Sequence, residues 1–264
     1  MTAPPPAAPL RVASVSYYNA KPLVHDLVDD PRVRLLYRVP AKLLDTLRDG
    51  EADVALLPVI DYQRMPGLRV IPAGGIGCDG PTLTVRIFSH VPVKRIASLA
   101  CDGDSHTSVA LARVLLGESY GIRPPLLPLE ERTTADAVLL IGDKVVCDEP
   151  RGYEHQLDLG AAWKKLTGLP FLFAVWTARA GVGLGDLPSR LAEAKRRGLA
   201  DPDVLVARYA VPRGWPPKIA RQYVTDYLQY DVGLRQLEAV RLFHEHAAHY
   251  GLIDAPPRPL VVEG

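Results

Sequence analysis

The sequence predicts an α/β protein with two lobes and a ligand cleft between them. Over the first two thirds of the 264 residues, short apolar runs alternate with helical patterns, which is typical of mostly parallel sheets covered by helices. The last third changes to segments rich in helix-forming residues, with apolar side chains at a spacing of three to four. Polar residues collect at the ends of four predicted strands, and ligands of such folds bind beyond the strand ends.

The predicted strands are short apolar runs that stop at small or polar residues. The first follows a loose Pro- and Ala-rich tail at residues 1–9, and Pro22 stands soon after it, where a helix can begin. Gly50 ends the first predicted helix, and Pro58 stops the second strand. The expected strands are residues 10–16, 53–57, 85–88, 96–101 and 137–141, and the expected helices are residues 41–49, 107–116, 189–197 and 218–250.

The two lobes are expected to form because the chain leaves the first lobe, builds the second and returns. The crossings are predicted in extended segments near residues 86–90 and 173–179. Lobe one then comprises residues 1–88 and 178–264, and lobe two comprises residues 89–177. This layout places the ligand between the lobes.

Composition excludes several classes of protein. Lys and Arg number 31 against 30 Asp and Glu, and this balance argues against nucleic acid or an anionic membrane as the main partner. No apolar segment approaches the roughly 18 residues of a membrane span, and the N-terminus has no signal-peptide pattern, so we expect a cytoplasmic protein. The three cysteines lack CxxC spacing and are expected to be small, reduced, buried side chains. We expect a monomer or a homodimer that binds a small molecule.

The most specific polar segment is the loop DGDSHTS at residues 102–108. Ser105, Thr107 and Ser108 stand where a helix is predicted to begin. Their hydroxyls would cap the helix, or would bind a carboxylate or phosphate together with the free backbone N–H groups, and the two interpretations are compatible. Asp104 and His106 share this loop and are candidate ligand contacts with it.

The other three strand ends supply further candidates for ligand contact. Ser16, Tyr17 and Asn19 follow the first strand, and Asn19 either forms a turn or presents its amide to the cleft. Pro58 follows the second strand. Asp143 comes after a glycine at the last strand end, where it either orients a ligand hydroxyl or caps the next segment.

The aromatic residues are expected mainly in the core. Trp163, Phe171 and Phe173 have no pattern beyond that of apolar core residues. Trp176 stands at the predicted crossing between lobes and is therefore a candidate to line the cleft.

Several other chemistries are disfavoured. HEHAAH at residues 244–249 is not HExxH, and on a helix His244 and His249 lie about 140° apart, so a solvated helix face is expected rather than a metal site. The glycines of residues 74–80 form no GxGxxG fingerprint, and no GxSxG motif or pair of catalytic carboxylates stands out. An enzyme built from these residues would act by positioning and charge stabilisation.

Five segments together resemble the MqnA family, the chorismate dehydratases of the futalosine route to menaquinone. They are SYYNAKPL (16–23), ADVALLPVIDY (52–62), GPTLTVRIFSHVP (80–92) leading into DGDSHTSVALARVLL (102–116), LLIGD (139–143) and DLGAAWKKLTGLPFLFAVW (158–176). The resemblance implies a type II periplasmic-binding-protein fold used as a cytosolic enzyme. It also implies loss of water from chorismate to give 3-[(1-carboxyvinyl)oxy]benzoate, without a cofactor or a metal.

The resemblance also implies roles for individual residues. Asn19 falls on the family's motif asparagine at the reacting ring, and Thr84 stands where the family usually has serine, so these two are the expected catalytic residues. Leu83 stands where many members carry arginine, Arg86 would face differently on a strand, and His106 replaces a more usual arginine. No strong side-chain base is visible, so the substrate's enolpyruvyl carboxylate is expected to take the ring proton while Asn19 and Thr84 hold the geometry.

Two alternatives stay open. One is a binding protein of the same fold that captures a small carboxylate without chemistry, against which the missing signal peptide counts. The other is the sister enzyme of the same route, which forms 1,4-dihydroxy-6-naphthoate from a cyclic futalosine derivative. The text TGLPFLFAVW at residues 167–176 fits the dehydratase better.

Overall fold

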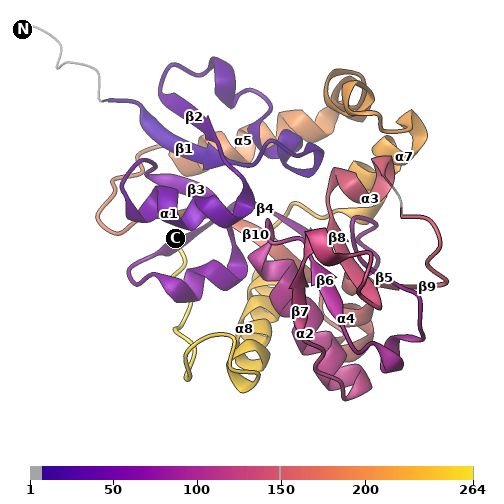
Figure 1. Cartoon of the computed structure of the whole chain (residues 1–264). Coiled ribbons are helices and arrows are strands. Elements are labelled where there is room, and N and C mark those ends of the chain that lie inside the picture. Colours follow the sequence, from indigo (N-terminus) through magenta and orange to yellow (C-terminus); the bar gives the residue numbers. More distant parts are fainter. Residues whose placement is uncertain (1–7, 149, 264) are drawn as a thin grey trace, which may run out of the picture.

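Two five-stranded sheets form the two lobes of the molecule (Figure 1). The structure is a computed structural model that describes residues 8–148 and 150–263. The predicted two-lobed α/β fold is confirmed, whereas the tail expected over residues 1–9 lies almost wholly outside the described residues. Figure 1 shows the first sheet at the upper left and the second at the lower right.

The first sheet has the strand order β2-β1-β3-β10-β4. β1 pairs in parallel with β2 and β3, whereas β10 runs antiparallel to both β3 and β4. The strands are β1 (Leu10–Ser14), β2 (Val33–Tyr37), β3 (Val54–Pro58), β4 (Arg69–Cys78) and β10 (Phe171–Ala178).

The second sheet has the order β7-β6-β8-β5-β9 and the same mixed character. β6 is parallel to β7 and β8, and β5 is antiparallel to β8 and β9. The strands are β5 (Val85–Ser89), β6 (Leu99–Cys101), β7 (Leu126–Pro128), β8 (Ala137–Ile141) and β9 (His155–Asp158). The alternating pattern predicts mostly parallel sheets. The two strands that follow the crossings, β5 and β10, instead run antiparallel to their neighbours, so each sheet is mixed.

The strand pairing places both crossings earlier than residues 86–90 and 173–179. β5 lies wholly in the second sheet, although the expected boundary at residue 88 assigns most of it to lobe one. β10 lies in the first sheet, although the expected boundary at residue 178 assigns almost all of it to lobe two. Sequence alone could not assign these strands because either sheet can accept an apolar strand that is buried on both faces.

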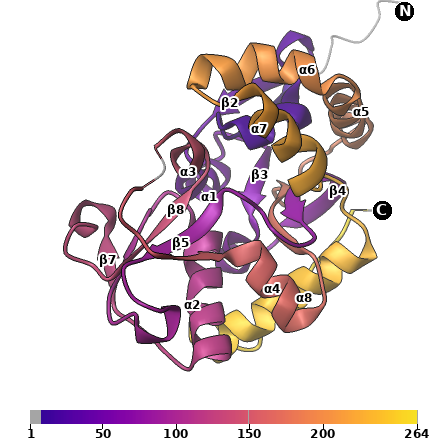
Figure 2. The same cartoon turned by 90° about the vertical axis from the view of Figure 1, so that its right-hand side faces the viewer.

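Helices cover both sheets and close the two ends of the molecule (Figure 2). In that view α5, α6 and α7 lie at the top, and α2, α4 and α8 lie at the bottom. The α-helices are α1 (Leu43–Arg48), α2 (His106–Tyr120), α3 (Asp143–Cys147), α4 (Leu159–Thr167), α5 (Leu187–Ala200), α6 (Pro202–Leu205), α7 (Pro217–Gln222) and α8 (Leu234–His249). The 3-10 helices that matter for the site are η1 (Tyr18–Val24) and η4 (Val59–Arg64), and the π-helical turn η9 spans Tyr223–Tyr227.

The helix expected over residues 218–250 is interrupted by an extended segment. The backbone of Gln229 exchanges hydrogen bonds with Gly77 on β4, and Tyr230 accepts one from Gly75. The extended segment therefore pairs with β4, the edge strand of the first sheet, before α8 begins. This long-range pairing outweighs the local helical pattern.

Aromatic side chains of α4, β10 and α8 form a part of the core that joins the two lobes. Trp163 on α4 packs edge-on against Phe171 of β10, and Phe243 of α8 packs on Phe171 as well, with ring centroids 5.3 and 5.1 Å apart respectively. Trp163 and Phe171 are thus core residues, as the sequence predicts. No helix of the described residues is long and apolar enough to cross a membrane.

Candidate functional site

A cavity of about 70 Å³ lies between the two sheets. The four predicted polar strand ends converge on it, since β1 and β3 end there from the first sheet and β6 and β8 from the second. The C-terminal segment supplies a third wall. The lining residues are Val15, Tyr17, Asn19, Pro40, Leu56, Pro58, Ile76, Thr82, Thr84, Val85, Ser105, Thr107, Ser108, Ile141, Gly142, Phe173, Ala174, Tyr223 and Leu228.

The loop after β1 brings Tyr17 and Asn19 to the cavity. Asn19 lies in η1, and its Oδ1 atom is buried without a hydrogen-bond partner among the described residues. An unpaired buried acceptor is costly, so this atom is available to a ligand. Burial, helped by the nearby carboxylates of Asp104 and Asp102, raises the pKa of Tyr17 to about 12.

A strained turn presents Thr82 and Thr84 to the cavity from the second lobe. Leu83 between them has a φ of 66°, and the Thr84 N–H donates to the Thr82 carbonyl at 2.7 Å. A positive φ is unfavourable for leucine by about 1–2 kcal/mol. The carboxylate of Asp158 accepts hydrogen bonds from the N–H groups of Thr82 and Leu83 at 2.9–3.1 Å, and this clamp holds the turn. Arg86 contacts Gln156 and Asp158 instead of lining the cavity.

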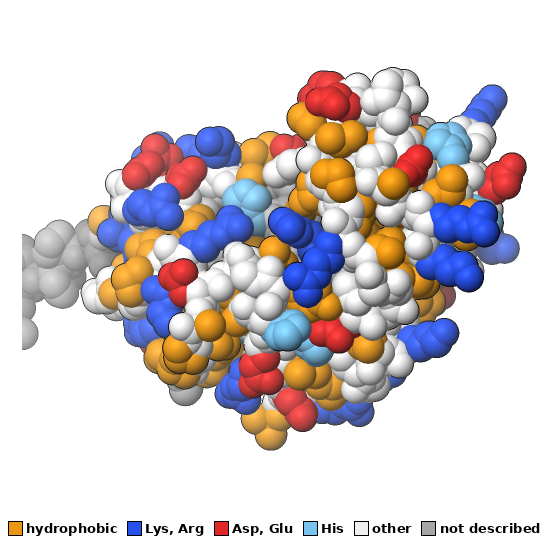
Figure 3. Space-filling model, turned by 60° about the horizontal axis from the view of Figure 1, so that its bottom comes forward, with side chains coloured by type: hydrophobic (Ala, Val, Ile, Leu, Met, Phe, Trp, Pro, Cys, Tyr) orange, Lys and Arg blue, Asp and Glu red, His pale blue; other side chains and the backbone are white. Residues whose placement is uncertain are grey.

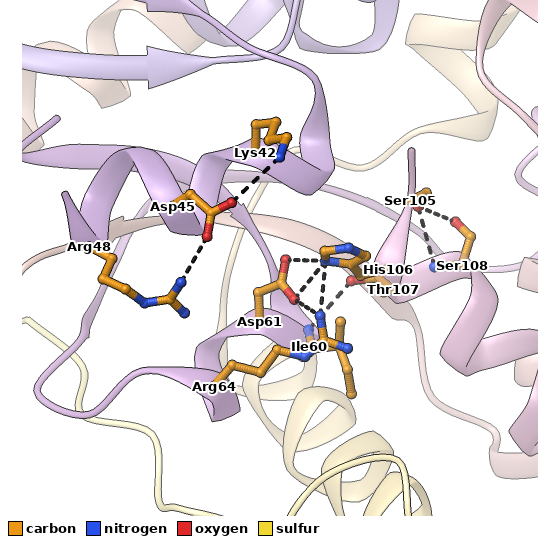
Figure 4. Close-up of polar contacts among 10 residues, drawn as sticks. All are labelled: Lys42, Asp45, Arg48, Ile60, Asp61, Arg64, Ser105, His106, Thr107 and Ser108. Atoms are coloured by element: carbon orange, nitrogen blue, oxygen red, sulfur yellow. Dashed lines mark hydrogen bonds and ion pairs between the residues drawn. The ribbon is translucent and has the colours of Figure 1, made fainter. Parts of the chain in front are cut away.

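The beginning of α2 also lines the cavity. Ser105 is the N-cap, and its hydroxyl accepts from the Ser108 N–H at 3.3 Å and donates to the Ser108 hydroxyl at 2.8 Å (Figure 4). The predicted capping is confirmed. Ser105, Thr107 and Ser108 all line the cavity, so a helix start with its positive dipole end lies against the ligand space.

An ion-pair cluster beside this helix start joins the two lobes (Figure 4). His106 on α2 donates from Nδ1 to the carboxylate of Asp61 on η4 at 2.9 Å, and Arg64 donates to the same carboxylate at 2.8 Å. Asp61 is completely buried. His106 therefore acts as a bridge between the lobes and does not line the cavity.

The end of β8 contributes backbone rather than a charged side chain. Gly142 has a φ of 63° and a ψ of −144°, a conformation suited to glycine, and its N–H donates to the Thr84 carbonyl at 2.9 Å. Asp143 points to the C-terminal segment, where Trp215 donates to it at 3.1 Å and Arg213 lies 3.8 Å away. Burial raises the pKa of Asp143 above its ordinary value.

Tyr223 is a lining residue that the sequence analysis missed. Its hydroxyl lies 2.6 Å from the Thr84 hydroxyl, and its ring stacks on Trp215 with centroids 5.0 Å apart. Tyr223 begins the π-helical turn η9, and the backbone bond from the Leu228 N–H closes this turn. No spacing in the surrounding helical pattern marks this tyrosine, because the turn that aims it at the cavity is irregular.

Of the twelve expected site residues, seven line the cavity and five lie elsewhere. The lining seven are Tyr17, Asn19, Pro58, Thr84, Ser105, Thr107 and Ser108. Ser16 is exposed, Asp104 lies 3.7 Å from Lys144, and Trp176 is fully buried in the core beside Gly74. His106 and Asp143 make the contacts between elements described above.

Two expectations outside the cavity need correction. His244 is buried, not on a solvated helix face, because it packs on the inner side of α8 next to Phe243. Cys147 is exposed, unlike the buried Cys78 and Cys101, because α3 lies at the surface.

The lining offers hydroxyl, amide and backbone groups with no formally charged side chain among the described residues. The described part of the chain also holds no cluster of three His, Cys, Asp or Glu residues suited to a metal ion. On the face shown in Figure 3, Lys and Arg side chains are interspersed with Asp and Glu and with hydrophobic side chains. The site is thus suited to a small molecule that is held by neutral donors and by the start of α2.

Fold and cavity define a two-lobed protein with a periplasmic-binding-protein-like fold and a cavity between the lobes. A crystal structure of an Archaeoglobus fulgidus protein matches 94% of this chain and 99% of its own, with 17% identity and a TM-score of 0.74. The periplasmic aliphatic sulphonate binding protein SsuA from Escherichia coli matches 98% of this chain and 95% of its own, with 15% identity and a TM-score of 0.67. These likenesses concern the fold.

The chain belongs to the menaquinone biosynthesis family, whose profile matches residues 10–249. The chorismate dehydratase of Thermus thermophilus is 30% identical over 233 residues, which cover 80% of this chain and 85% of that protein. The chorismate dehydratase of Campylobacter jejuni is 25% identical over 236 residues, covering 87% and 93% of the two chains.

Proposed function

We propose that this protein is a chorismate dehydratase, which converts chorismate to 3-[(1-carboxyvinyl)oxy]benzoate and water. The observation that carries the proposal is the meeting of Asn19, Thr84 and the start of α2 in one cavity between the lobes. The family membership and the names of the two relatives point to the same reaction. No observation favours the sister enzyme or a binding protein without chemistry.

The cavity can bind one carboxylate of chorismate at the start of α2. The hydroxyls of Ser105, Thr107 and Ser108 line that wall, and the first N–H groups of a helix lack partners within the helix. An anion there also lies at the positive end of the helix dipole. The ring would then lie between the first lobe and the turn that carries Thr84.

The reaction breaks one C–H and one C–O bond and makes the ring aromatic. The ring carbon that bears the enolpyruvyl ether loses its proton, the electron pair forms the new ring double bond, and the neighbouring hydroxyl leaves with its own bonding pair. The departing hydroxide and the removed proton together make water. Stabilising the leaving oxygen is a task for fixed hydrogen-bond donors, which act strongly in a closed cavity.

The enolpyruvyl carboxylate of the substrate serves as the base in this proposal. The described lining residues include no carboxylate, imidazole or amine, so the protein has no strong base in contact with the ligand space. The phenol of Tyr17 is a poor substitute because its pKa is raised to about 12. Asn19 and Thr84 then act by holding the ring hydroxyl and the proton that is lost in the correct geometry.

The first experiment mixes the purified protein with chorismate, without added metal or cofactor, and follows mass and ultraviolet absorbance. The expected product has lost the mass of one water and shows a new benzenoid spectrum. Asn19→Ala should lower kcat by about 10²-fold, as expected for loss of a fixed polar contact at the reacting bond. Unchanged chorismate in the presence of folded wild-type protein would refute the function, and turnover of the cyclic futalosine derivative would identify the sister enzyme.

We also propose a cytoplasmic location and a monomer or homodimer. The free state of Cys78, Cys101 and Cys147 supports a reducing compartment. Gel filtration with light scattering tests the oligomeric state, and fractionation of cells tests the location.

A further inference from the structure

The carboxylate of Asp61 connects the first lobe to the start of α2. Asp61 lies on η4 and is completely buried, and both of its oxygen atoms are 2.9 Å from Nδ1 of His106 (Figure 4). Because a carboxylate can only accept, His106 is the donor in this contact. The backbone N–H of Ile60 also donates to the Thr107 hydroxyl at 3.4 Å, which is a second contact between η4 and α2. Moving α2 away from η4 would therefore take a donor from a buried carboxylate, which is unfavourable.

Arg64 pairs with Asp61 as well, but it does not join the lobes. Arg64 donates to the Asp61 carboxylate at 2.8 Å from a position three residues further along the same helix η4. This ion pair therefore stays together whether or not the lobes move. The same guanidinium lies 3.0 Å from Nδ1 of His106, so two donors converge on one carboxylate. Of these two, His106 is the donor that belongs to the second lobe.

η4 holds Asp61 at a fixed place on the first lobe. The Val59 carbonyl accepts a hydrogen bond of 2.8 Å from α8, and the Tyr62 hydroxyl accepts one of 2.9 Å from the Val261 N–H. Pro58, which lines the cavity, directly precedes η4. The position of Asp61 is thus tied to the first-lobe residues of the cavity.

The part of α2 that Asp61 contacts belongs to the cavity wall. His106 is the first residue of α2 and stands between Ser105 and Thr107, which both line the cavity. A shift of His106 relative to η4 would move these hydroxyls, and the free N–H groups of the helix start, relative to Asn19 of the first lobe.

We propose that Asp61 is a positioning residue that holds the start of α2, and with it the carboxylate-binding wall of the cavity, in place against the first lobe. The inference rests on the proposed dehydratase function and adds the residue that sets the spacing of the two lobes at the ligand. Asp61 acts through His106 and does not itself line the cavity.

The test compares Asp61→Asn with Asp45→Asn. Asparagine has the shape of aspartate, but it replaces one acceptor oxygen with an N–H group that faces the donors of His106 and Arg64. KM for chorismate should rise about fivefold and kcat should stay within about twofold, since the wall holds the substrate carboxylate equally in the ground state and in the transition state. A merely structural role would lower the melting temperature without this split between KM and kcat, so thermal unfolding of both variants is measured as well.

Asp45 is the matched control because it also pairs with two cations (Figure 4). Lys42 lies 3.8 Å and Arg48 lies 2.8 Å from its carboxylate, and all three residues lie at the surface of the first lobe. Asp45→Asn should therefore leave both constants unchanged. An equal rise of KM in both variants would show a general effect of charge and would overturn the inference.

An electrostatic explanation predicts the opposite sign. Asp61 is a negative charge close to the binding site of an anion, so its removal should strengthen binding if the position of α2 does not matter. In a His106→Ala background, Asp61→Asn should raise KM little further, whereas independent action gives increases that multiply. A lower KM in Asp61→Asn, or increases that multiply, would overturn the inference and leave the dehydratase function intact.

A measurement without turnover keeps the two proposals separable. Benzoate carries one carboxylate on a six-membered ring, and calorimetry should show that wild-type protein binds it about fivefold more tightly than Asp61→Asn does. If wild-type protein fails to turn over chorismate, the proposed function fails and the binding of benzoate alone decides. Benzoate that binds both proteins equally, or neither of them, would refute the positioning role of Asp61.

Discussion

Acid should destabilise this protein through the buried imidazole of His244. Its Nε2–H donates to the Val59 carbonyl at 2.8 Å, and its Nδ1 accepts from the Gln63 amide at 2.9 Å. Gln63 cannot reverse its amide without loss, because Arg258 engages both ends of it, accepting at its carbonyl and donating from its N–H. A second proton on His244 would therefore meet an N–H group.

The magnitude follows from the pKa. Burial lowers the pKa of His244 from 6.5 to about 4. Between these two values the unfolded chain binds more protons than the folded one, so stability is complete above pH 6.5 and falls as the pH drops toward 4. From pH 7 to pH 5 this one group should lower the free energy of unfolding by about 2 kcal/mol, or about 5 °C in Tm for a chain of this size.

The assay is thermal unfolding by circular dichroism at pH 7 and pH 5. His244→Gln lowers stability at pH 7, yet it should lose about 2 kcal/mol less than wild type on acidification. His249→Gln, an exposed imidazole of the same helix, should behave as wild type. Equal acid losses in wild type and His244→Gln would refute the reasoning.

Three further substitutions test features that hold the site. Asp158→Asn removes the charge of the carboxylate that holds the turn carrying Thr84, so the free energy of unfolding should fall by about 1–3 kcal/mol and kcat should fall. An unchanged kcat would contradict this role of Asp158. His106→Ala removes a bridge to the buried Asp61, so KM measured by steady-state kinetics should rise by several-fold, and an unaltered KM would exclude a role in holding the lobes together. Gly198→Ala places a Cβ against the backbone oxygen of Pro22 in η1, so Tm should fall by several degrees, and wild-type Tm would show that α5 shifts freely.

The sequence predicts the site residues that follow strands better than the site residues that irregular or long-range structure brings to the cavity. Ser105 could be located as a helix cap because capping is a local property of Ser followed by a helical run. Asn19 was located by its position after a strand and by family resemblance. Both lie in the cavity because β1 of the first sheet and β6 of the second sheet end there.

The misplaced residues depend on irregular or long-range structure. Trp176 lies in β10, whose pairing with β4 shifts register between Leu172 and Ala174 and again between Val175 and Thr177. Such bulges change which side chains face which side, so a simple alternation does not identify Phe173 as the lining aromatic residue. His106 faces Asp61 across the lobes, a contact that only the assembled fold creates.

His244 shows a signal that was present but overlooked. Val240, Phe243 and Ala247 are buried on α8, and His244 stands four residues after the first and three before the last. Residues with these spacings share a helix face. The periodicity of α8 therefore places His244 on the buried face of the helix, whereas the local motif HEHAAH taken alone does not indicate burial.

The π-helical turn at Tyr223 makes the site sensitive to the length of one helix. Such a turn contains more residues than an α-helical turn, and each residue of an α-helix advances the chain by about 100°. Deleting one residue from 223–227 would restore a regular helix and rotate the chain on either side of the deletion relative to the other. A chain lacking this extra residue would keep a well-formed helix and still lose the alignment of its tyrosine with Thr84, so a deletion of one residue here would disturb the site without disturbing the helix.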